Sequence, residues 1–557
     1  MKSHTFFFFF LLSLFFVGSG FAQKAKNRGP TLEDVQKFEN WLELYARGDK
    51  PILVKGRVNR RELNAFRVRA EKIAAGNDLA AAKRLFSVLT LQLNPDLNKY
   101  RRLAAQLGIV RSIARELIQK IKDPAVDGWL LKKLAKRKKG EAAVLERIAI
   151  IDMLGIRANK KIGKLFFKRL GHLSVPDRIQ ALLVLPRLGD KGMIGSVLKL
   201  LKQRDPNLKI AAIAAITGLL APYSDETLPA NQAKDSYGQQ MTPLVLSALE
   251  KTILRNPAWQ VRAAVVDGLV RLKSSKSIPV LIKALKAESK RGKNRSERLL
   301  HQIHGALEQL TGIKMAEGRP QFWEDFWAKE GPTFHYGAKK KGQGKPSEKP
   351  GSKSDYVKYF NLDLHSKRNL FIVDFSGSMA ERVRLKTRYA RGAKKPKYEI
   401  VKKELEKVIR ALPPDSVANV IFFGTKVSIW RANPKGRPRP VSMTESNKAD
   451  LLQYIWETTP GGSTNLFGAL KAGLTMADRG LYDKYYKTSF DSIYLLSDGA
   501  PSSGEIVDPS RILHEVKKIN QLRRVKIHTI VFGDEGNNLN FMRRLAAESG
   551  GTFLHVQ

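Results

Sequence analysis

The stretch from residue 371 to residue 379 reads Phe371-Ile372-Val373-Asp374-Phe375-Ser376-Gly377-Ser378-Met379. Its first half is β-branched and aromatic, which is typical of a buried strand. Its second half contains an acid, two hydroxyls and a glycine, which indicates a loop at the carboxyl end of that strand. Ligands of open α/β sheets bind at such ends, and oxygen side chains of this kind suit Mg²⁺ or Mn²⁺. Ordinary turns share this composition, so a metal site requires further ligands elsewhere.

Two later loops supply candidates for those ligands. A second acid, Asp498, follows the apolar run Ile493–Leu496 and the residue Ser497. The loop Pro460–Leu466 places two glycines before Thr464, and glycine lets the backbone approach closely. The alternative interpretation of the acids is as helix N-caps, and of the serines as turn residues.

Strands and helices alternate around these loops. The pattern predicts strands at Leu370–Phe375, Val417–Phe423, Val427–Arg431, Ser492–Leu496, Lys526–Phe532 and Thr552–Val556. It predicts helices at Tyr398–Ala411, Lys448–Glu457, Leu466–Asp478, Pro509–Gln521 and Leu539–Glu548. Such alternation favours a mostly parallel sheet with helices on both faces. The short connection between the second and third strands predicts one antiparallel edge.

Residues 366–557 resemble a von Willebrand factor A domain, and the three loops resemble its metal-ion-dependent adhesion site. The resemblance implies a doubly wound, Rossmann-like sheet of order 3-2-1-4-5-6, with the two acids beside its switch point. It implies one divalent ion, Mg²⁺ or alternatively Mn²⁺ or Ca²⁺. The implied metal ligands are Asp374, Ser376, Ser378, Thr464 and Asp498. In the family the open metal position accepts a carboxylate, so the implied partner is a protein with an exposed Asp or Glu.

The sequence departs from the family pattern just after the first loop. The passage into the next helix is lengthened and basic, and its candidate ligand-rim residues are Arg382, Arg384, Lys386, Arg388 and Arg391. A cationic rim beside a metal favours an acidic ligand and speeds its approach. The alternative is a surface loop without a role in binding.

An all-α region precedes this domain. From residue 79 to residue 330, Leu, Ala, Ile and Lys recur at helical spacing,. Four similar segments begin near Arg147, Arg178, Lys209 and Val261, and the first three lie 31 residues apart, since 178 − 147 and 209 − 178 are both 31. These segments resemble HEAT repeats, which predicts a helical-repeat solenoid. The role of the helical segment 23–78 is open.

The chain carries two further boundaries. Residues 1–22 have the apolar core and small residues of a signal peptide, with cleavage between Ala22 and Gln23,. This predicts an extracytoplasmic protein, periplasmic or secreted; an uncleaved anchor is the alternative. No later stretch is expected to span a membrane. The basic, Lys/Gly/Pro-rich segment 331–365 is predicted to be a linker.

Composition limits the function classes. The chain has 557 residues, no cysteine and a net charge of +47, which favours anionic partners. No phosphate loop, His-Glu-x-x-His motif or nucleophile elbow is present, so we expect a non-enzymatic binding or scaffold protein. Alternatives are an electrostatic binder of anionic polysaccharide or of an envelope surface, and an accessory subunit of a larger assembly. Nucleic acid fits the charge but conflicts with the signal peptide.

Overall fold

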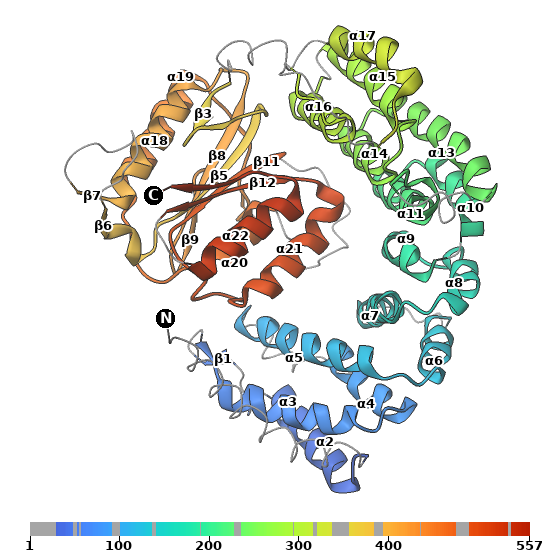
Figure 1. The fold of residues 1–557 in the computed structure, drawn as a ribbon. Helices are drawn as coiled ribbons and strands as arrows, with labels where there is room; N and C mark the ends of the chain where they lie inside the picture. The colour runs from blue at the N-terminus through green and yellow to red at the C-terminus, as the bar shows by residue number, and fades with distance from the viewer. Residues whose placement is uncertain are drawn as a thin grey trace, which may run out of the picture. The chain divides into compact units, whose positions relative to one another are not determined.

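A computed structural model gives the fold of the chain (Figure 1). It describes residues 29–556 except 48, 50–52, 55–56, 92–100, 136–140, 190, 228–235, 293–294, 316–319, 337–355, 384–393, 435, 475–489 and 533–535. The predicted signal peptide and its cleavage site, Ala22 and Gln23, lie outside these residues. The chain forms two compact units, Met1–Ile162 and Gly163–Gln557.

The first unit is helical, apart from one short hairpin. Its helices are α2 (Leu32–Arg47), α3 (Arg60–Ala74), α4 (Leu79–Thr90), α5 (Arg101–Lys120), α6 (Ala125–Leu134) and α7 (Glu141–Arg157), followed by the 3₁₀ turn η2 (Lys160–Ile162). The hairpin pairs β1 (Leu53–Val54) with β2 (Arg57–Val58). In α2 and α3 apolar residues recur every three or four positions, so Phe38, Trp41 and Phe66 meet in a buried core,.

The second unit begins with helices that pack against their neighbours in sequence. They are α8 (Gly163–Leu170), α9 (Val175–Leu188), α10 (Ile194–Leu198), α11 (Pro206–Ser224), α13 (Ser236–Arg255), α14 (Trp259–Arg271), α15 (Ser277–Ser289), α16 (Glu297–Thr311) and α17 (Pro320–Glu330), with 3₁₀ turns η3 (Lys191–Met193), η4 (Lys199–Lys202) and η6 (Gly331–Thr333). All four sequence-similar segments fall within helices, namely α7, α9, α11 and α14. An all-helical region therefore precedes the sheet, and its assignment as a HEAT solenoid stays a prediction.

Helix α11 differs from one expectation. Within the described residues it is long and apolar enough to cross a membrane by length and composition, although no such stretch was expected after the signal peptide. About 67% of its apolar window is buried inside the protein. It packs against α9, α13 and α14, and this central position requires an apolar surface on nearly every side.

The start of α11 provides a test of local stability. Asp205 is the N-cap, and its carboxylate accepts hydrogen bonds from the amides of Asn207 (2.8 Å) and Leu208 (3.0 Å). Asp205→Ala is expected to lower the free energy of unfolding by about 1 kcal/mol, because these amides lose their acceptor. Chemical denaturation measures this loss. Asp415→Ala is the control, since the side-chain contact of Asp415 within the described residues is an exposed pair with Lys367. An equal loss there would contradict the capping explanation.

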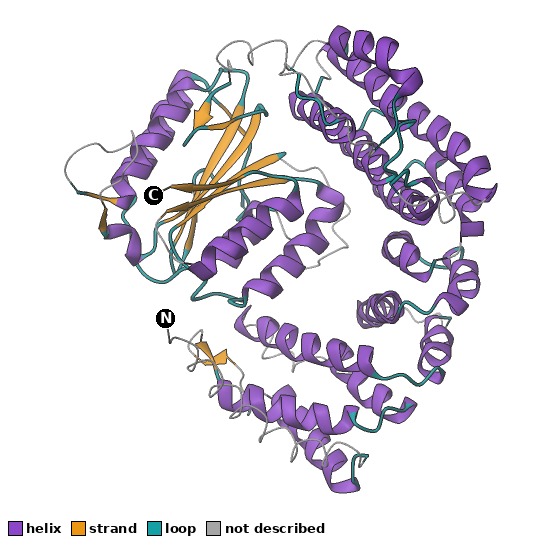
Figure 2. Ribbon diagram, in the orientation of Figure 1, coloured by secondary structure: helices purple, strands orange, loops and turns teal. Residues whose placement is uncertain are grey.

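The sheet of the second unit has the predicted doubly wound topology (Figure 2). Its strands are β5 (Arg368–Asp374), β8 (Val417–Phe423), β9 (Val427–Ile429), β10 (Val441–Ser442), β11 (Ser492–Ser497), β12 (Lys526–Phe532) and β13 (Phe553–Val556). The strand order is β10-β8-β5-β11-β12-β13, and β9 also pairs with β8. The pairs among β8, β5, β11, β12 and β13 are parallel, whereas β9 and β10 run antiparallel to β8. The mostly parallel sheet and its antiparallel edge are confirmed.

Helices cover both faces of this sheet (Figure 1). One face packs against α18 (Lys397–Ala411) and α19 (Glu445–Glu457), and the other against α20 (Leu466–Gly473), α21 (Pro509–Arg523) and α22 (Gly536–Ser549). Alternate side chains of β5 divide between the faces: Phe371 and Val373 enter the first core, and Leu370 and Ile372 the second. A strand that is buried on both faces must be apolar throughout, which explains the continuous run before Asp374.

A small hairpin at the start of this domain was not predicted. Strands β3 (Lys358–Tyr359) and β4 (Leu362–Asp363) pair antiparallel. The two residues between them, Phe360 and Asn361, have φ of 46° and 71°, as a two-residue hairpin turn with right-handed twist requires. Tyr359 and Phe360 are fully buried and pack against Phe371 and Phe532. Part of the predicted linker 331–365 is therefore folded onto the sheet; residues 337–355 lie outside the described part.

Candidate functional site

Two acids end adjacent parallel strands at one edge of the sheet. Asp374 is the last residue of β5, and Asp498 directly follows Ser497, the last residue of β11. Strands β5 and β11 are neighbours at the point where the strand order reverses. The carboxyl ends of such strands form a crevice that the flanking loops can line. Both acids are buried, with exposed fractions of 0% and 2%.

Hydrogen bonds join the first loop to the end of β11. The Oδ1 atom of Asp374 accepts from the backbone amide of Ser376 at 2.9 Å, and Oδ2 accepts from the Ser497 hydroxyl at 2.6 Å. The hydroxyls of Ser376 and Ser378 lie 3.1 Å apart; Ser376 is the N-cap of the 3₁₀ turn η7 (Gly377–Ala380), and Ser378 lies within that turn. Ser378 donates to Oδ1 of Asp498 at 2.8 Å. We call these five residues the hydroxyl–carboxylate cluster.

The glycine loop lies directly against the first loop. The carbonyl of Gly462 accepts from the amide of Gly377 at 2.9 Å, and the amide of Gly461 donates to the carbonyl of Phe375 at 2.7 Å. Gly462 has a φ of 78°, which non-glycine residues rarely adopt. These contacts place Thr464 in the loop beside the hydroxyl–carboxylate cluster.

A third loop fixes Thr464 from the other side. The Thr464 amide donates to the Ser502 hydroxyl at 2.9 Å, and the amides of Ser502 and Ser503 donate to the Thr464 carbonyl at 3.0 and 3.2 Å. Thr464 has an exposed fraction of 6%. The next residue, Asn465, is the N-cap of α20 (Leu466–Gly473), and its side chain accepts from the amide of Gly468 at 3.0 Å. All five predicted site residues therefore lie on three mutually bonded loops at one edge of the sheet.

Lys397 is the nearest cation to this group in the described contacts. Its ammonium donates to Oδ2 of Asp498 at 2.9 Å and to Glu381 at 2.7 Å. Lys397 is the first residue of α18, and its amide bonds the carbonyl of Glu381 at 3.0 Å. Burial lowers the pKa of Lys397, but the hydrogen bonds to Glu381 and Asp498 raise it by more, so the pKa lies above its ordinary value of 10.5. The lysine is therefore charged at neutral pH.

Burial raises the pKa of Asp374. Loss of hydration raises its pKa from 3.8 to about 6, and the charge of Asp498 adds to this increase,. Hydrogen bonds from Ser497 and Ser376 oppose the increase only in part. At neutral pH the carboxylate is ionised at a cost in folding energy, which a nearby cation would relieve.

The donor chemistry of these residues fits a small divalent cation. Three hydroxyls and two carboxylates are hard oxygen donors, and a set with few acids suits a cation that retains several waters. Among the described residues, no group of three or more His, Cys, Asp and Glu side chains could hold a metal. A metal site here would thus depend on Ser376, Ser378 and Thr464 as well as on the two acids.

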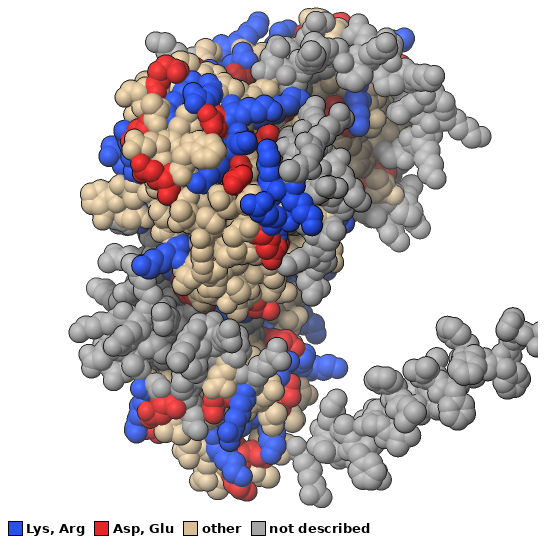
Figure 3. Space-filling model, turned by 90° about the vertical axis from the view of Figure 1, so that its left-hand side faces the viewer, with Lys and Arg blue, Asp and Glu red and all other residues tan. Residues whose placement is uncertain are grey.

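Most of the predicted ligand rim lies outside the described residues. Arg382 is described and exposed, in the ribbon of β6 (Arg382–Val383) and β7 (Lys395–Pro396). Arg384, Lys386, Arg388 and Arg391 fall within residues 384–393, which are not described. On the face drawn in Figure 3, described Lys and Arg side chains lie among Asp and Glu side chains. The role of the rim stays a prediction.

Two members of the arrangement were not assigned a role by sequence reasoning. In the sequence, Ser497 is the residue before Asp498, and Lys397 is one of several basic residues in a lengthened loop. The position of Ser497 at a strand end, beside a candidate ligand, was an available signal. Lys397 had none, because its contact with Asp498 joins positions 101 residues apart.

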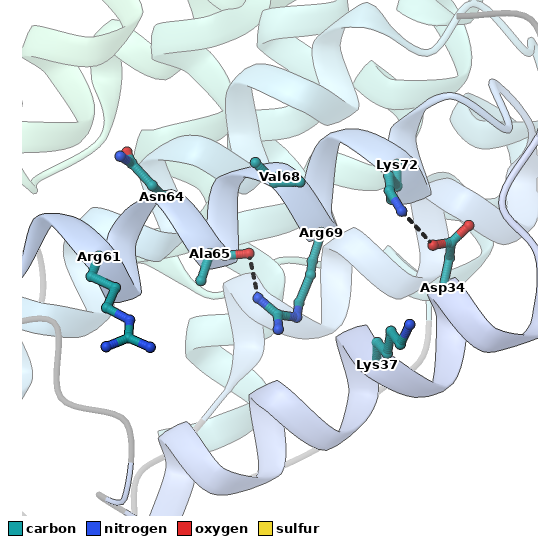
Figure 4. A pocket seen from close by; sticks show the side chains of 8 residues that line it. All are labelled: Asp34, Lys37, Arg61, Asn64, Ala65, Val68, Arg69 and Lys72. Carbon is teal, nitrogen blue, oxygen red and sulfur yellow. Dashed lines mark hydrogen bonds and ion pairs between the residues drawn. The ribbon is translucent and has the colours of Figure 1, made fainter. Parts of the chain in front are cut away.

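A basic hollow in the first unit is a second candidate site (Figure 4). It lies between α2 and α3 and has a volume of about 430 Å³. Its lining residues are Asp34, Lys37, Arg61, Asn64, Ala65, Val68, Arg69 and Lys72. Lys72 bonds Asp34 at 2.9 Å, which neutralises one cation. Lys37, Arg61 and Arg69 also line the hollow, and Lys37 pairs with Glu33. The lining is therefore net positive, which suits an anion.

Comparison with known proteins agrees with the fold of the sheet domain. Residues 389–554 match the family model of the von Willebrand factor type A domain. The chain thus carries a C-terminal von Willebrand factor type A domain; Asp374, Ser376 and Ser378 precede the matched range. The hamster (Mesocricetus auratus) inter-alpha-trypsin inhibitor heavy chain H3 is 27% identical over 205 residues, 36% of this chain and 20% of the relative. The mouse (Mus musculus) heavy chain H2 is 30% identical over 203 residues, 35% of this chain and 19% of the relative.

Two solved structures are similar to about a third of this chain. A von Willebrand factor type A protein from Catenulispora acidiphila is 15% identical, with a TM-score of 0.26, and the match covers 34% of this chain and 38% of that one. The SpRpn10 VWA domain is 10% identical, with a TM-score of 0.23, over 34% of this chain and 86% of that one. The chain matches only about a fifth of the length of the heavy-chain relatives.

Proposed function

We propose that the protein is a non-enzymatic binding protein whose A-type domain forms a metal-ion-dependent adhesion site. Asp374, Ser376, Ser378, Thr464 and Asp498 would hold one divalent ion, Mg²⁺ or alternatively Mn²⁺ or Ca²⁺. When bound, the ion would supply a Lewis-acidic position for a carboxylate of the partner. The observation that carries this proposal is the hydroxyl–carboxylate cluster, which joins hard oxygen donors from the ends of two adjacent strands.

Each residue has a separate task in this proposal. Ser376 and Ser378 present neutral oxygens. The bound ion would therefore keep most of its positive charge and would attract an incoming carboxylate. Asp374 is held by the Ser376 amide and the Ser497 hydroxyl and keeps one orientation. Asp498 is likewise held between Ser378 and Lys397. A site whose donors are already oriented loses little entropy when its ligands bind.

The family assignment supports a protein partner. A von Willebrand factor type A domain suggests a role in binding or adhesion, and the heavy-chain relatives are by name parts of an inhibitor of trypsin. We therefore propose a protein partner with an exposed Asp or Glu, and the helical region as a second interaction surface. The apolar N-terminal segment supports a location outside the cytoplasm, periplasmic or secreted.

Metal titration tests the proposal. Isothermal titration calorimetry of the full chain is expected to show one Mn²⁺ or Mg²⁺ ion bound by the wild type. Ser378→Ala should reduce the affinity at least about tenfold, since one ligand and the anchor of Asp498 are lost together. Ser428→Ala is the matched control, because Ser428 lies on β9 and bonds only Tyr454 in the described contacts. Absence of a bound ion in the wild type would contradict the metal claim.

Ligand binding is tested with a defined acidic probe. Poly-L-glutamate should bind the wild type in Mg²⁺ and lose most of this affinity in EDTA. The Ser378→Ala variant should show the weak affinity of the EDTA condition even when Mg²⁺ is present. Binding that is equal in both conditions would contradict a metal-bridged contact.

The basic hollow between α2 and α3 favours a second candidate function, which is binding of an anionic polysaccharide or envelope surface. Lys37, Arg61 and Arg69 line it together with Lys72, and the chain carries a net charge of +47. This mode needs no metal. Binding of a sulfated polysaccharide such as heparin should weaken steeply as salt increases and should persist in EDTA, because counterion release drives it.

A further inference from the structure

Lys397 is placed where a divalent ion would feel its charge. Its residue is only 7% exposed, and its ammonium lies 2.9 Å from Oδ2 of Asp498. The other oxygen of Asp498 accepts from Ser378, one of the proposed metal ligands. Asp498 therefore lies directly between the ammonium and the serine hydroxyls.

The fold holds the lysine in this position from two directions. The ribbon of β6 and β7 brings Glu381 next to the start of α18, where the Lys397 amide bonds the Glu381 carbonyl. The Glu381 carboxylate then bonds the ammonium at 2.7 Å. A lysine side chain loses rotamer entropy when it becomes ordered. Because these contacts order Lys397 during folding, this entropy is not lost when a ligand binds.

The charges around the site then set how strongly a cation is attracted. Asp374, Asp498 and Glu381 carry three negative charges, and Lys397 cancels one of them. Asp374, Asp498 and Lys397 are buried, so their charges interact far more strongly than charges in water, whereas Glu381 is exposed,. The ammonium therefore repels a divalent ion on the far side of Asp498. The negative charge of an incoming carboxylate offsets this repulsion.

We propose that Lys397 is a fixed internal cation that keeps the affinity of the site for a divalent ion low until an acidic partner binds. This inference rests on the proposed metal site and makes Lys397 a specificity-determining residue of that site. The consequence is cooperative binding, in which the metal and the partner carboxylate each raise the affinity for the other. A purely structural lysine, which only ties the lengthened loop to the site, would not set metal affinity through its charge.

Direct measurement of Mn²⁺ affinity in the full chain tests this inference. Lys397→Met is expected to bind Mn²⁺ about tenfold more tightly than the wild type, because one buried positive charge is removed at similar side-chain length. Titration calorimetry or the electron paramagnetic resonance signal of free Mn²⁺ gives the affinity. Lys448→Met is the matched control: Lys448 is also buried, and it bonds the Arg410 carbonyl and Glu445 away from the cluster. It should leave Mn²⁺ affinity unchanged.

A second variant keeps the test decisive if Lys397→Met does not fold. Glu381→Gln changes a side chain that is 67% exposed and leaves the Lys397 charge to act on Asp498 alone. Its Mn²⁺ affinity is expected to fall about threefold; an unchanged or higher affinity would overturn the inference.

The outcomes separate this inference from the proposed function. Mn²⁺ binding to the wild type with equal or weaker affinity in Lys397→Met overturns the role of the lysine and leaves the metal site standing. Mn²⁺ binding to the wild type that becomes about tenfold tighter in Lys397→Met supports both. Absence of binding in the wild type and in every variant overturns the metal site and the inference together.

Discussion

Asp374→Asn is expected to stabilise the metal-free protein by up to about 3 kcal/mol at pH 8 while it abolishes metal binding. Burial raises the pKa of Asp374 from 3.8 to about 6, so the folded state holds this proton more tightly than the unfolded state. The stability that protonation provides is complete below pH 3.8 and is lost as the pH rises through 6. Asparagine stays neutral at every pH, so the variant avoids this loss. Two pKa units correspond to about 3 kcal/mol.

The hydrogen bonds of Asp374 can persist in the variant. The amide oxygen can still accept from the backbone amide of Ser376, which bonds Asp374 now. The amide nitrogen can donate to the Ser497 hydroxyl, and that hydroxyl also lies 3.0 Å from the Gly499 carbonyl. Urea denaturation in EDTA should therefore show the gain at pH 8 and none at pH 4. A variant less stable than the wild type at pH 8 would contradict the burial argument.

Metal should reverse this comparison. A bound ion stabilises only the state that binds it, by RT ln(1 + [L]/Kd). Mg²⁺ should therefore raise the stability of the wild type and leave Asp374→Asn unchanged. Asp498→Asn is the matched control, because it removes the charged partner of the buried Lys397 and should destabilise the protein even without metal.

Gly424→Ala is expected to lower the free energy of unfolding by about 2–4 kcal/mol and to abolish metal binding. A Cβ atom at this position would lie 2.3 Å from the carbonyl oxygen of Gly461 and 3.3 Å from that of Phe375. Both are backbone atoms, so no side-chain rotation relieves the clash. The glycine loop must move away from the first loop, and the bond between Gly461 and Phe375 is lost with it. Thermal denaturation and Mn²⁺ titration measure the two effects.

The neighbouring Gly461→Ala is the control for this variant. A Cβ atom at Gly461 would meet nothing within 4 Å, although this residue lies in the same pair of loops. It should change stability by less than about 1 kcal/mol, the usual scale of a Gly-to-Ala change without strain. Equal losses in both variants would show that glycine flexibility, rather than close approach of the loops, is what the site needs.

Much of the sheet domain could be predicted because its signals are local. The apolar run before Asp374 is continuous, as burial on both faces requires, and the observed strands and helices begin within a few residues of the predicted ones. The strand order followed from the family resemblance and is confirmed. The hairpin with Tyr359 and Phe360 was not predicted, because Phe360 occupies a turn position where asparagine, aspartate or glycine is usual,. Its burial also depends on strands far along the chain.

The candidate site also has a part that the sequence predicts and a part that only the fold reveals. The sequence by itself determined which oxygen side chains end the strands, because strand and loop alternate visibly and Asp374, Ser376, Ser378, Thr464 and Asp498 stand at the transitions. Only the tertiary structure decided how these residues are held. Ser497 bonds Asp374 across 123 positions, and Lys397 bonds Asp498 across 101. Contacts of this range leave no periodic trace in a sequence, since they arise when parallel strands bring their carboxyl ends together. The charge balance around the proposed metal site is therefore a property of the fold, whereas the proposed ligand set is already present in the chain.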